Sequence, residues 1–183
     1  MKTLIIYGSP KKEGNSATLA KRFRQGLMEN GALEIKEIWL NDLDIKPCQG
    51  CFRCAANASC YIDDDMRQVY PELGKADLFV FATPIYWWHM IAQMKLFFDR
   101  MTARLSGSDK LTDLTGKNVV LIVTYNYYEC ARPVIKMFED FKGWIDVKLE
   151  VIDYCSLKEP VSNCEAKLDE AYQLGKTMAG CQK

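Results

Sequence analysis

Residues 1–18 read MKTLIIYGSPKKEGNSAT, and this stretch decides the fold. Residues 4–7 form an unbroken apolar run, which is typical of a strand buried on both faces of a parallel sheet. Residues 8–14 contain two glycines and a proline, and they therefore predict a turn. Asn15 and Ser16 are residue types that cap helix N-termini, and apolar residues follow them at helical spacing. The stretch therefore predicts a strand, a loop and a helix in that order.

The loop at residues 8–16 is suited to bind an anion. Backbone N–H groups of such a loop and of the first helical turn point toward one centre, where the helix dipole adds positive potential. Four side chains can add donors: Ser9, Asn15, Ser16 and Thr18. The loop is not a Walker A motif, because no Gly-Lys-Ser/Thr ends it, and its glycines do not fit Gly-x-Gly-x-x-Gly. A phosphate site and an ordinary turn without a ligand both stay open.

Length and charge exclude several classes of function. The chain has 183 residues, enough for one domain with a sizeable core. Its 24 basic and 24 acidic residues cancel, which argues against a nucleic-acid partner or an acidic membrane surface. The first residues do not resemble a signal peptide, and no apolar run reaches the roughly 20 residues of a membrane-spanning helix. We therefore expect a cytoplasmic protein whose eight cysteines are thiols or metal ligands.

Strands and helices alternate along the rest of the chain. After the strand at residues 4–7, the pattern predicts strands at 34–40, 78–82, 119–123 and 147–152. Helical spacing predicts helices at 16–30, 66–75, 92–104, 132–143 and 162–178, the first of them ending at Gly31. This alternation predicts an α/β fold: a three-layer sandwich with a five-stranded parallel sheet in the order 2-1-3-4-5. We expect one domain over residues 1–183, with a cysteine-rich insertion at 41–62 between strands 2 and 3.

Three local features carry their own expectations. Pro71 should kink or restart the helix at 66–75. The aspartates at 63–65 are interpreted as a helix cap and a solvated helix start rather than as a metal site. Residues 105–117 contain two glycines and two serines and predict a mobile surface loop.

Two distinctive loops should meet at one edge of the sheet. In a sheet of this order, ligands bind outside the carboxyl ends of strands 1 and 3, where the winding reverses. The loops at residues 8–16 and 83–88 follow these two strands. Tyr86 and Trp87 lie beyond the strand end, so they are candidates to contact a planar ring rather than to fill the core. His89, the only histidine, has no acid–base partner in the pattern and is interpreted as structural or adjacent to a cofactor.

These loops resemble those of the flavodoxin-like NAD(P)H-dependent FMN reductase superfamily. The resemblance rests on residues 8–16, on 83–88, and on the Gln93-Met94-Lys95 and Phe98-Asp99-Arg100 segments. It implies a phosphate loop formed by Ser9, Pro10, Lys11, Gly14, Asn15, Ser16 and Thr18. It implies flavin contacts from Pro84, Ile85, Tyr86 and Trp87, and from a third loop with Thr124, Asn126 and Tyr127. Trp88 stands where relatives often have a small residue, and the third loop lacks the glycine that they often have.

The resemblance also implies an activity. The chain is expected to be an FMN-dependent NAD(P)H oxidoreductase that passes electrons to a small acceptor such as a quinone or a flavin. The cofactor carries this chemistry, so no side chain is expected to act as a catalytic nucleophile or base. The family likeness further implies a homodimer.

A run of cysteines marks the insertion. Cys48, Cys51, Cys54 and Cys60 have the spacing C-x2-C-x2-C-x5-C, which is closer to iron–sulfur ligation than to paired zinc motifs. The run resembles the motif of the iron–sulfur flavoproteins, a branch of the same superfamily, which implies a 4Fe–4S cluster on these four residues. Zinc and free or redox-active thiols stay open as alternatives. The remaining cysteines are interpreted as ordinary thiols: Cys130, Cys155, Cys164 and Cys181.

Two other functions compete with the reductase. The first is a non-enzymatic carrier that relays electrons between ferredoxin and a partner through FMN and an iron–sulfur cluster. Zero net charge argues against the strongly acidic type of carrier. The second is a flavin-free scaffold with a zinc-stabilised loop, which the aromatic residues at 86–88 disfavour.

Overall fold

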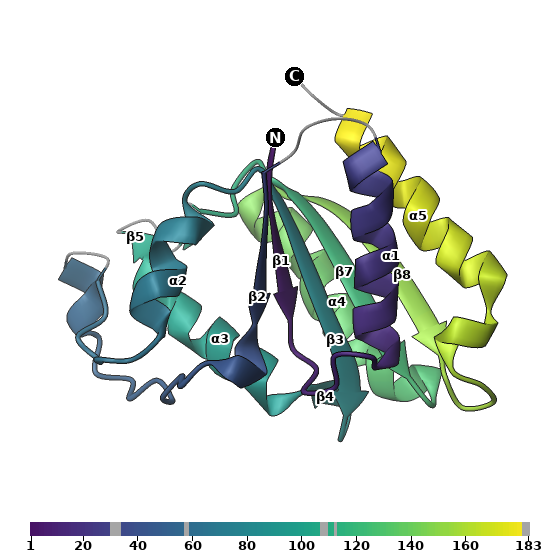
Figure 1. Ribbon diagram of the computed structural model, residues 1–183. Helices are drawn as coiled ribbons and strands as arrows, with labels where there is room; N and C mark the ends of the chain where they lie inside the picture. The colour runs from purple at the N-terminus through teal and green to yellow at the C-terminus, as the bar shows by residue number, and fades with distance from the viewer. Residues whose placement is uncertain (30–33, 57–58, 107–109, 112, 181–183) are drawn as a thin grey trace.

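A computed structural model describes residues 1–29, 34–56, 59–106, 110–111 and 113–180 of the chain (Figure 1). Five long strands form a parallel sheet in the order β2-β1-β3-β7-β8, which confirms the predicted order. The strands are β1 (Lys2–Tyr7), β2 (Glu34–Trp39), β3 (Leu78–Tyr86), β7 (Asn118–Tyr125) and β8 (Lys148–Cys155). The short strand β4 (His89–Met90) pairs with the end of β3, and β5 (Leu105–Ser106) pairs with β6 (Lys110–Leu111).

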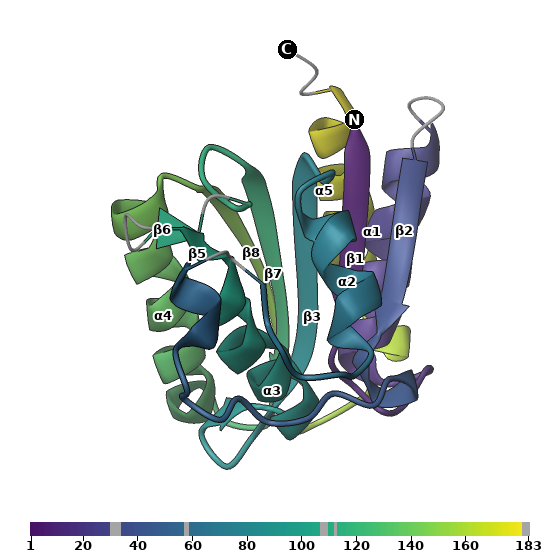
Figure 2. The ribbon, with the colours of Figure 1, turned by 90° about the vertical axis from the view of Figure 1, so that its left-hand side faces the viewer.

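Helices cover both faces of this sheet (Figures 1 and 2). On one face lie α1 (Asn15–Glu29) and α5 (Glu165–Gly180). On the other lie α2 (Met66–Leu73), α3 (Ala92–Arg100) and α4 (Tyr128–Ile145). Short 3-10 segments complete the chain: η1 (Leu40–Asp42), η2 (Arg53–Ala56), η3 (Met101–Arg104) and η4 (Val161–Asn163).

The sequence of β1 shows why the molecule has three layers. Successive side chains of a strand point to opposite faces, and every residue from Leu4 to Tyr7 is apolar. Leu4 and Ile6 join the core under α2, α3 and α4. Ile5 and Tyr7 join the separate core under α1 and α5. The strand is therefore buried on both sides, as its unbroken apolar run predicts.

Two glycines bring α1 and α5 into close contact. A Cβ atom built on Gly26 would lie 2.0 Å from the carbonyl oxygen of Tyr172. A Cβ on Gly175 would lie 2.1 Å from the carbonyl oxygen of Phe23. Real Cβ atoms do not come this close to backbone, so the distance between the two helices requires glycine at both positions.

Several predicted boundaries were wrong. β3 extends beyond residue 82 to Tyr86, because its last residues pair with β4. α4 begins at Tyr128 rather than near residue 132, and Pro133 lies inside the helix, which buries Ala131 ahead of it. α2 is a single helix through Pro71, so the proline does not restart it. The predicted end of the first helix at residues 30–31 lies outside the described residues.

The segment 105–117 is not wholly a surface loop. It contains the β5–β6 pair, and the side chains of Asp113 and Leu114 are buried. Asp113 accepts two hydrogen bonds from Arg104, at 2.6 and 3.1 Å. Residues 107–109 and 112 lie outside the described part, so mobility there stays a prediction. In the part of the chain that the structure describes, no helix combines the length and apolar character needed to span a membrane.

Candidate functional site

A cavity of about 670 Å³ opens at the carboxyl ends of the parallel strands, and we call it the large cavity. It lies where the loops after β1, β3 and β7 meet, at the reversal of the winding order. Of the predicted cofactor residues, these line it: Ser9, Lys11, Gly14, Asn15, Ser16, Pro84, Ile85, Tyr86, Trp87, Thr124, Asn126 and Tyr127. Pro10 and Thr18 are not among the lining residues, and their contacts with a cofactor stay a prediction.

Five lining residues were not predicted as cofactor contacts, although the first two belong to the predicted loops: Glu13, Trp88, Tyr125, Cys130 and Ser156. Cys130 lines the cavity because α4 begins earlier than its proline suggests. Ser156 follows β8 and reaches the site through a bond from its N–H to the carbonyl of Tyr125, 2.7 Å long. No motif in the sequence marks either residue.

The loop after β1 is held by short-range hydrogen bonds. Ser9 is buried, and its Oγ accepts the N–H of Lys11 at 3.1 Å and donates to the Lys11 carbonyl at 3.3 Å. The N–H of Gly14 donates to that same carbonyl at 3.0 Å. A Cβ on Gly14 would lie 3.2 Å from the Lys11 oxygen and 3.3 Å from Ser9 Oγ, which is a tight fit. The loop therefore has a defined shape that depends on glycine at position 14.

The N-terminus of α1 forms one wall of the large cavity. The first turn of a helix has N–H groups without intrahelical partners and carries positive potential. Gly14, Asn15 and Ser16 all line the cavity at this turn. The side chain of Asn15 does not cap the helix as predicted, since its Oδ1 accepts the N–H of Val161 at 3.0 Å. This bond attaches the start of α1 to the segment that leads into α5.

The aromatic segment is a β-hairpin rather than a loop. Tyr86 pairs with His89, and Trp87 and Trp88 form the two-residue turn between them. Both tryptophans have positive φ, 49° and 60°, a conformation that normally selects Asn or Gly. Trp87 is 90% exposed. The hairpin thus holds two large rings at the mouth of the cavity at a cost in backbone strain.

The third loop joins β7 to α4. Asn126 is held by the last residue of β8 and the residue after it: Cys155 Sγ donates to its carbonyl at 3.2 Å, and Ser156 Oγ donates to its Oδ1 at 3.2 Å. Tyr125 hydrogen bonds to Asp153. Burial, followed by this hydrogen bond, raises the pKa of Tyr125 above its ordinary value. Tyr127 is exposed and adds another aromatic ring to the lining of the large cavity.

The four predicted metal ligands surround a second, smaller cavity. Cys48, Cys51, Cys54 and Cys60 line this cysteine cavity of about 190 Å³, together with Arg100 and other side chains. Burial is the main cause that raises the pKa of the Cys54 thiol, and the neighbouring thiols add to it. Among the described residues, no three His, Cys, Asp or Glu side chains are grouped closely enough to hold a single metal ion. The thiols thus surround a space rather than converge on one point.

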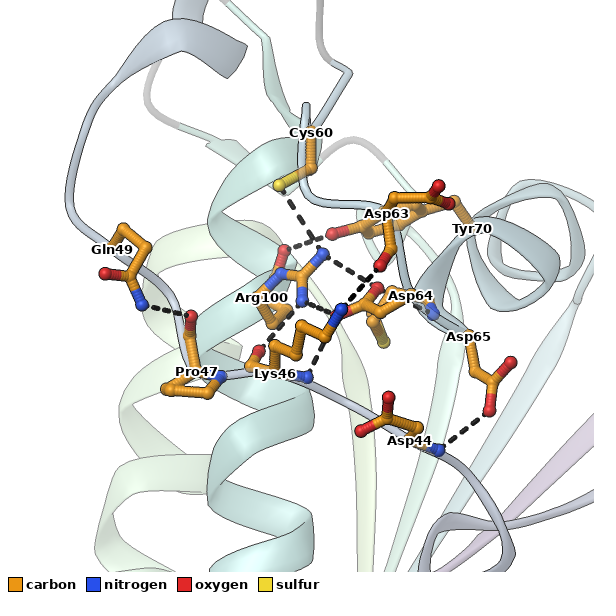
Figure 3. A network of polar contacts seen from close by, with 11 residues as sticks. Asp44, Lys46, Pro47, Gln49, Cys60, Asp63, Asp64, Asp65, Tyr70 and Arg100 are labelled. Carbon is orange, nitrogen blue, oxygen red and sulfur yellow. Dashed lines mark hydrogen bonds and ion pairs between the residues drawn. The ribbon is translucent and has the colours of Figure 1, made fainter.

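A buried ion pair closes the cysteine loop, which we define as residues 47–62 (Figure 3). The side chains of Arg100 and Asp64 are 1% and 0% exposed and form a two-pronged ion pair. The solvated helix start predicted for Asp64 was therefore wrong. Its side chain does bind the start of α2, as a capping residue would, because its Oδ1 accepts the N–H of Met66 at 3.1 Å. Burial opposes ionisation of Asp64, but hydrogen bonds from Arg100 and from backbone N–H groups outweigh it and lower its pKa.

Both cavities can be tested against the cofactors that the sequence implies. The large cavity has the volume of a small-molecule site, a helix N-terminus for an anion, and exposed rings for a planar group, so it fits FMN. The cysteine cavity offers four thiols, and Arg100 Nε is buried without a hydrogen-bond partner among the described residues. This donor set suits a sulfur-ligated group larger than a single ion.

Comparisons with known sequences identify the family of the chain. The family model for NADPH-dependent FMN reductases matches residues 1–155. An iron–sulfur flavoprotein of Archaeoglobus fulgidus is 35% identical over 101 residues, 55% of this chain and 46% of the relative. An FMN-dependent NADH:quinone oxidoreductase of Exiguobacterium is 31% identical over 111 residues, 54% of this chain and 53% of the relative. The chain spans about half the length of the curated relatives it matches.

Solved structures confirm the architecture. An NAD(P)H:quinone oxidoreductase from Methanothermobacter marburgensis superimposes with a TM-score of 0.71 at 18% identity, covering 97% of this chain and 96% of that one. An FMN-dependent NADH-azoreductase from Bacillus anthracis gives 0.72 at 14% identity, covering 98% and 100%. Identities this low show the fold alone, which is flavodoxin-like. Because the family model spans residues 1–155 and with them the three loops of the large cavity, the chain belongs to the NADPH-dependent FMN reductase family.

Proposed function

We propose that this chain is an FMN-dependent NAD(P)H oxidoreductase that delivers electrons to a small acceptor. The observation that carries the proposal is that loops far apart in the sequence line one cavity. Ser9 and Tyr86 come from different loops, and both border the same space of about 670 Å³. Family membership supports FMN as the occupant and NAD(P)H as the co-substrate.

The loop after β1 would hold the FMN phosphate. Gly14, Asn15 and Ser16 offer backbone N–H groups at the start of α1, and Ser9 keeps the loop in shape through its bonds to Lys11. Lys11 lines the same wall and can add a positive charge, while Glu13 beside it adds a negative one. The phosphate would therefore be held mainly by backbone groups and the helix dipole.

The hairpin and the third loop would hold the ring system. Thr83 is fully buried and braces the base of the hairpin, donating to the Pro84 carbonyl at 2.9 Å and accepting the N–H of Ile91 at 3.4 Å. Tyr86 and Trp87 then present aromatic surface to the cavity. A planar ring can stack there while the other face stays open to a second planar substrate.

The protein's task is binding and orientation. The chemistry that FMN would supply when bound is hydride transfer from NAD(P)H and electron transfer to an acceptor such as a quinone or a flavin. The chain contributes the phosphate site, an aromatic rim that shields the ring from water, and backbone groups around Pro84 and Asn126 that can hydrogen bond to the ring edge. Quinone reduction is named for relatives of similar sequence or fold.

Titration with FMN tests the proposal. We expect the colourless protein to take up FMN in a 1:1 ratio, with quenching of flavin fluorescence, and NADPH or NADH to bleach the bound flavin when oxygen is excluded. Tyr86→Ala should weaken binding, whereas Gly143→Ala, on α4 with open space around the added methyl group, should not. A protein that takes up no FMN would end the proposal.

The cysteine cavity favours a second candidate, an FMN and iron–sulfur carrier that exchanges electrons with ferredoxin. Four thiols around one cavity support a 4Fe–4S cluster as its occupant. Iron and acid-labile sulfide should then be found after anaerobic purification; zinc in their place would contradict the cluster. Bleaching of the flavin by NADPH but not by reduced ferredoxin favours the enzyme, and the reverse favours the carrier.

A homodimer stays a prediction, for which sedimentation at equilibrium is the measurement.

A further inference from the structure

The two ends of the cysteine loop are joined by one side chain. Nη1 of Arg100 donates to the carbonyl oxygen of Lys46 at 2.8 Å, just ahead of the loop. Nη2 of the same guanidinium donates to Sγ of Cys60 at 3.5 Å, near the end of the loop. Figure 3 shows both contacts meeting at the guanidinium from opposite sides. Arg100 itself lies at the end of α3, so the loop is attached to a helix of the main fold.

Asp64 makes this arrangement possible. A guanidinium as buried as Arg100 needs a counter-charge, and Asp64 supplies it with both carboxylate oxygens. Asp64 also accepts the N–H of Lys46 at 2.9 Å. Asp64 and Arg100 therefore bind the same backbone residue, one through its N–H and the other through its carbonyl oxygen. Tyr70 of α2 donates to the Arg100 carbonyl at 3.0 Å and completes the network.

One hydrogen-bond donor of Arg100 is not used by these contacts. Nε is buried and has no hydrogen-bond partner among the described residues, and the side chain lines the cysteine cavity. A buried, unpaired N–H donor is costly unless something accepts its hydrogen bond. A sulfur-ligated cluster of four thiolates is anionic, and hydrogen bonds to its sulfurs and nearby charge tune its potential. The guanidinium of Arg100 therefore offers a hydrogen-bond donor of the kind that the sulfurs of such a cluster accept.

We propose that Arg100 is the positioning residue of the cysteine cavity, directing Cys60 Sγ inward and offering its unpaired Nε–H donor to a thiolate-ligated group there. This goes beyond the proposed flavin chemistry, because it concerns a different cavity. The chain holds Cys60 from a helix rather than from its own loop. Retention of an iron–sulfur group should thus depend on a residue that is 40 positions away in the sequence.

The test uses the 183-residue chain, reconstituted anaerobically with ferric iron, a thiol reductant and sulfide. The wild type should gain thiolate-to-iron charge-transfer absorption with about four irons per chain. Arg100→Gln should lose this absorption to a chelator about 10- to 100-fold faster, the usual cost of removing a group that orients a metal ligand. Arg104→Gln is the matched control, since Arg104 lies four residues on and pairs with Asp113 without lining either cavity.

A second readout separates positioning from mere folding. The reduction potential of the reconstituted group should fall in Arg100→Gln and return toward the wild-type value in Arg100→Lys, which restores the charge but not the forked geometry. If Arg100→Gln does not fold, Arg100→Met combined with Asp64→Asn removes both buried charges and should fold. That variant should bind FMN normally and still lose iron quickly.

Two results would overturn the proposal. One is a folded Arg100 variant that keeps its iron, sulfide and potential as the wild type does. The other is a wild type that takes up no iron and sulfide at all. Failure of FMN binding would instead count against the reductase, because the two cavities share no lining residue.

Discussion

The large cavity takes its walls from loops at the carboxyl ends of β1, β3 and β7, whereas the cysteine cavity takes its walls from an insertion and from α3 and η3. In the large cavity, the parallel strands bring the lining residues together. In the cysteine cavity, the buried pair of Arg100 and Asp64 does so. Removing a side chain should therefore weaken ligand binding at the first cavity and weaken the fold itself at the second.

Breaking the buried pair gives the largest expected effect. Asp64→Ala leaves the Arg100 guanidinium buried without its counter-charge, which should lower the free energy of unfolding by about 3–5 kcal/mol. Tyr86→Ala, at the exposed rim of the large cavity, should change it by about 0.5 kcal/mol or less. Urea denaturation followed by circular dichroism measures both. Equal losses for the two variants would show that the cavities do not differ in this way.

A methyl group at Gly14 should have the opposite effect: it should weaken FMN binding and leave the stability of the fold nearly unchanged. Gly14→Ala requires the Lys11 carbonyl or Ser9 Oγ to shift by a few tenths of an ångström, so FMN should bind about tenfold more weakly with little change in stability. Gly143→Ala adds the same atom in open space inside α4 and should stabilise the protein by about 0.5–1 kcal/mol. Flavin fluorescence titration gives the affinities. An unchanged affinity for FMN in Gly14→Ala would show that the phosphate does not bind at this loop.

Each cavity has an exposed aromatic residue with positive φ, which sharpens the comparison. Trp87 has φ of 49° at the large cavity, and Phe52 has φ of 54° at the cysteine cavity. Replacing either by glycine should relieve strain and stabilise the protein by about 1 kcal/mol in thermal unfolding. Only Trp87→Gly should weaken FMN binding. If Phe52→Gly weakened it equally, the two cavities would be coupled.

Acid should act on the cysteine cavity first, with the smallest effect of the four. The pKa of Asp64 is lower in the folded protein, so its contribution to stability is complete above the unfolded-state pKa of about 3.9 and is lost as the pH falls toward the folded value. Urea midpoints should therefore drop more steeply below pH 4 in the wild type than in the neutral Arg100→Met, Asp64→Asn variant. If the urea midpoints of the two proteins fell in parallel as the pH is lowered, the acid sensitivity would come from carboxylates other than Asp64.

Much of the large cavity could be predicted because its residues follow strand ends. Alternation of strands and helices, together with the reversal of winding between strands 1 and 3, places residues 8–16 and 83–88 side by side without any structure. The hairpin could not be predicted in the same way, since Trp-Trp is among the least expected pairs in a turn that needs positive φ at both positions. The early start of α4 was hidden by Pro133, a residue that usually marks a helix boundary.

The role of Arg100 could not be predicted for a different reason. Asp64 follows a cysteine-rich insertion and stands beside two other aspartates, a pattern that usually indicates an exposed helix start. Its partner is 36 residues further on, in a helix whose own pattern gives no sign of a buried charge. Only the packing of α3 against the insertion reveals the pair. Cysteine spacing predicts which sulfurs gather, but not what holds them.

The close approach of α1 and α5 at Gly26 and Gly175 links α5 to the helix that borders the large cavity. α5 lies beyond the residues that the family model matches, yet it touches α1 backbone to backbone, and Val161 ahead of it holds Asn15 at the opposite end of α1. α5 and the segment before it thus help to fix the position of the α1 N-terminus relative to the other loops of the large cavity. A bulkier residue at either glycine would push α1 away from α5. The phosphate site at the start of α1 would then be misaligned by a substitution that lies outside the site.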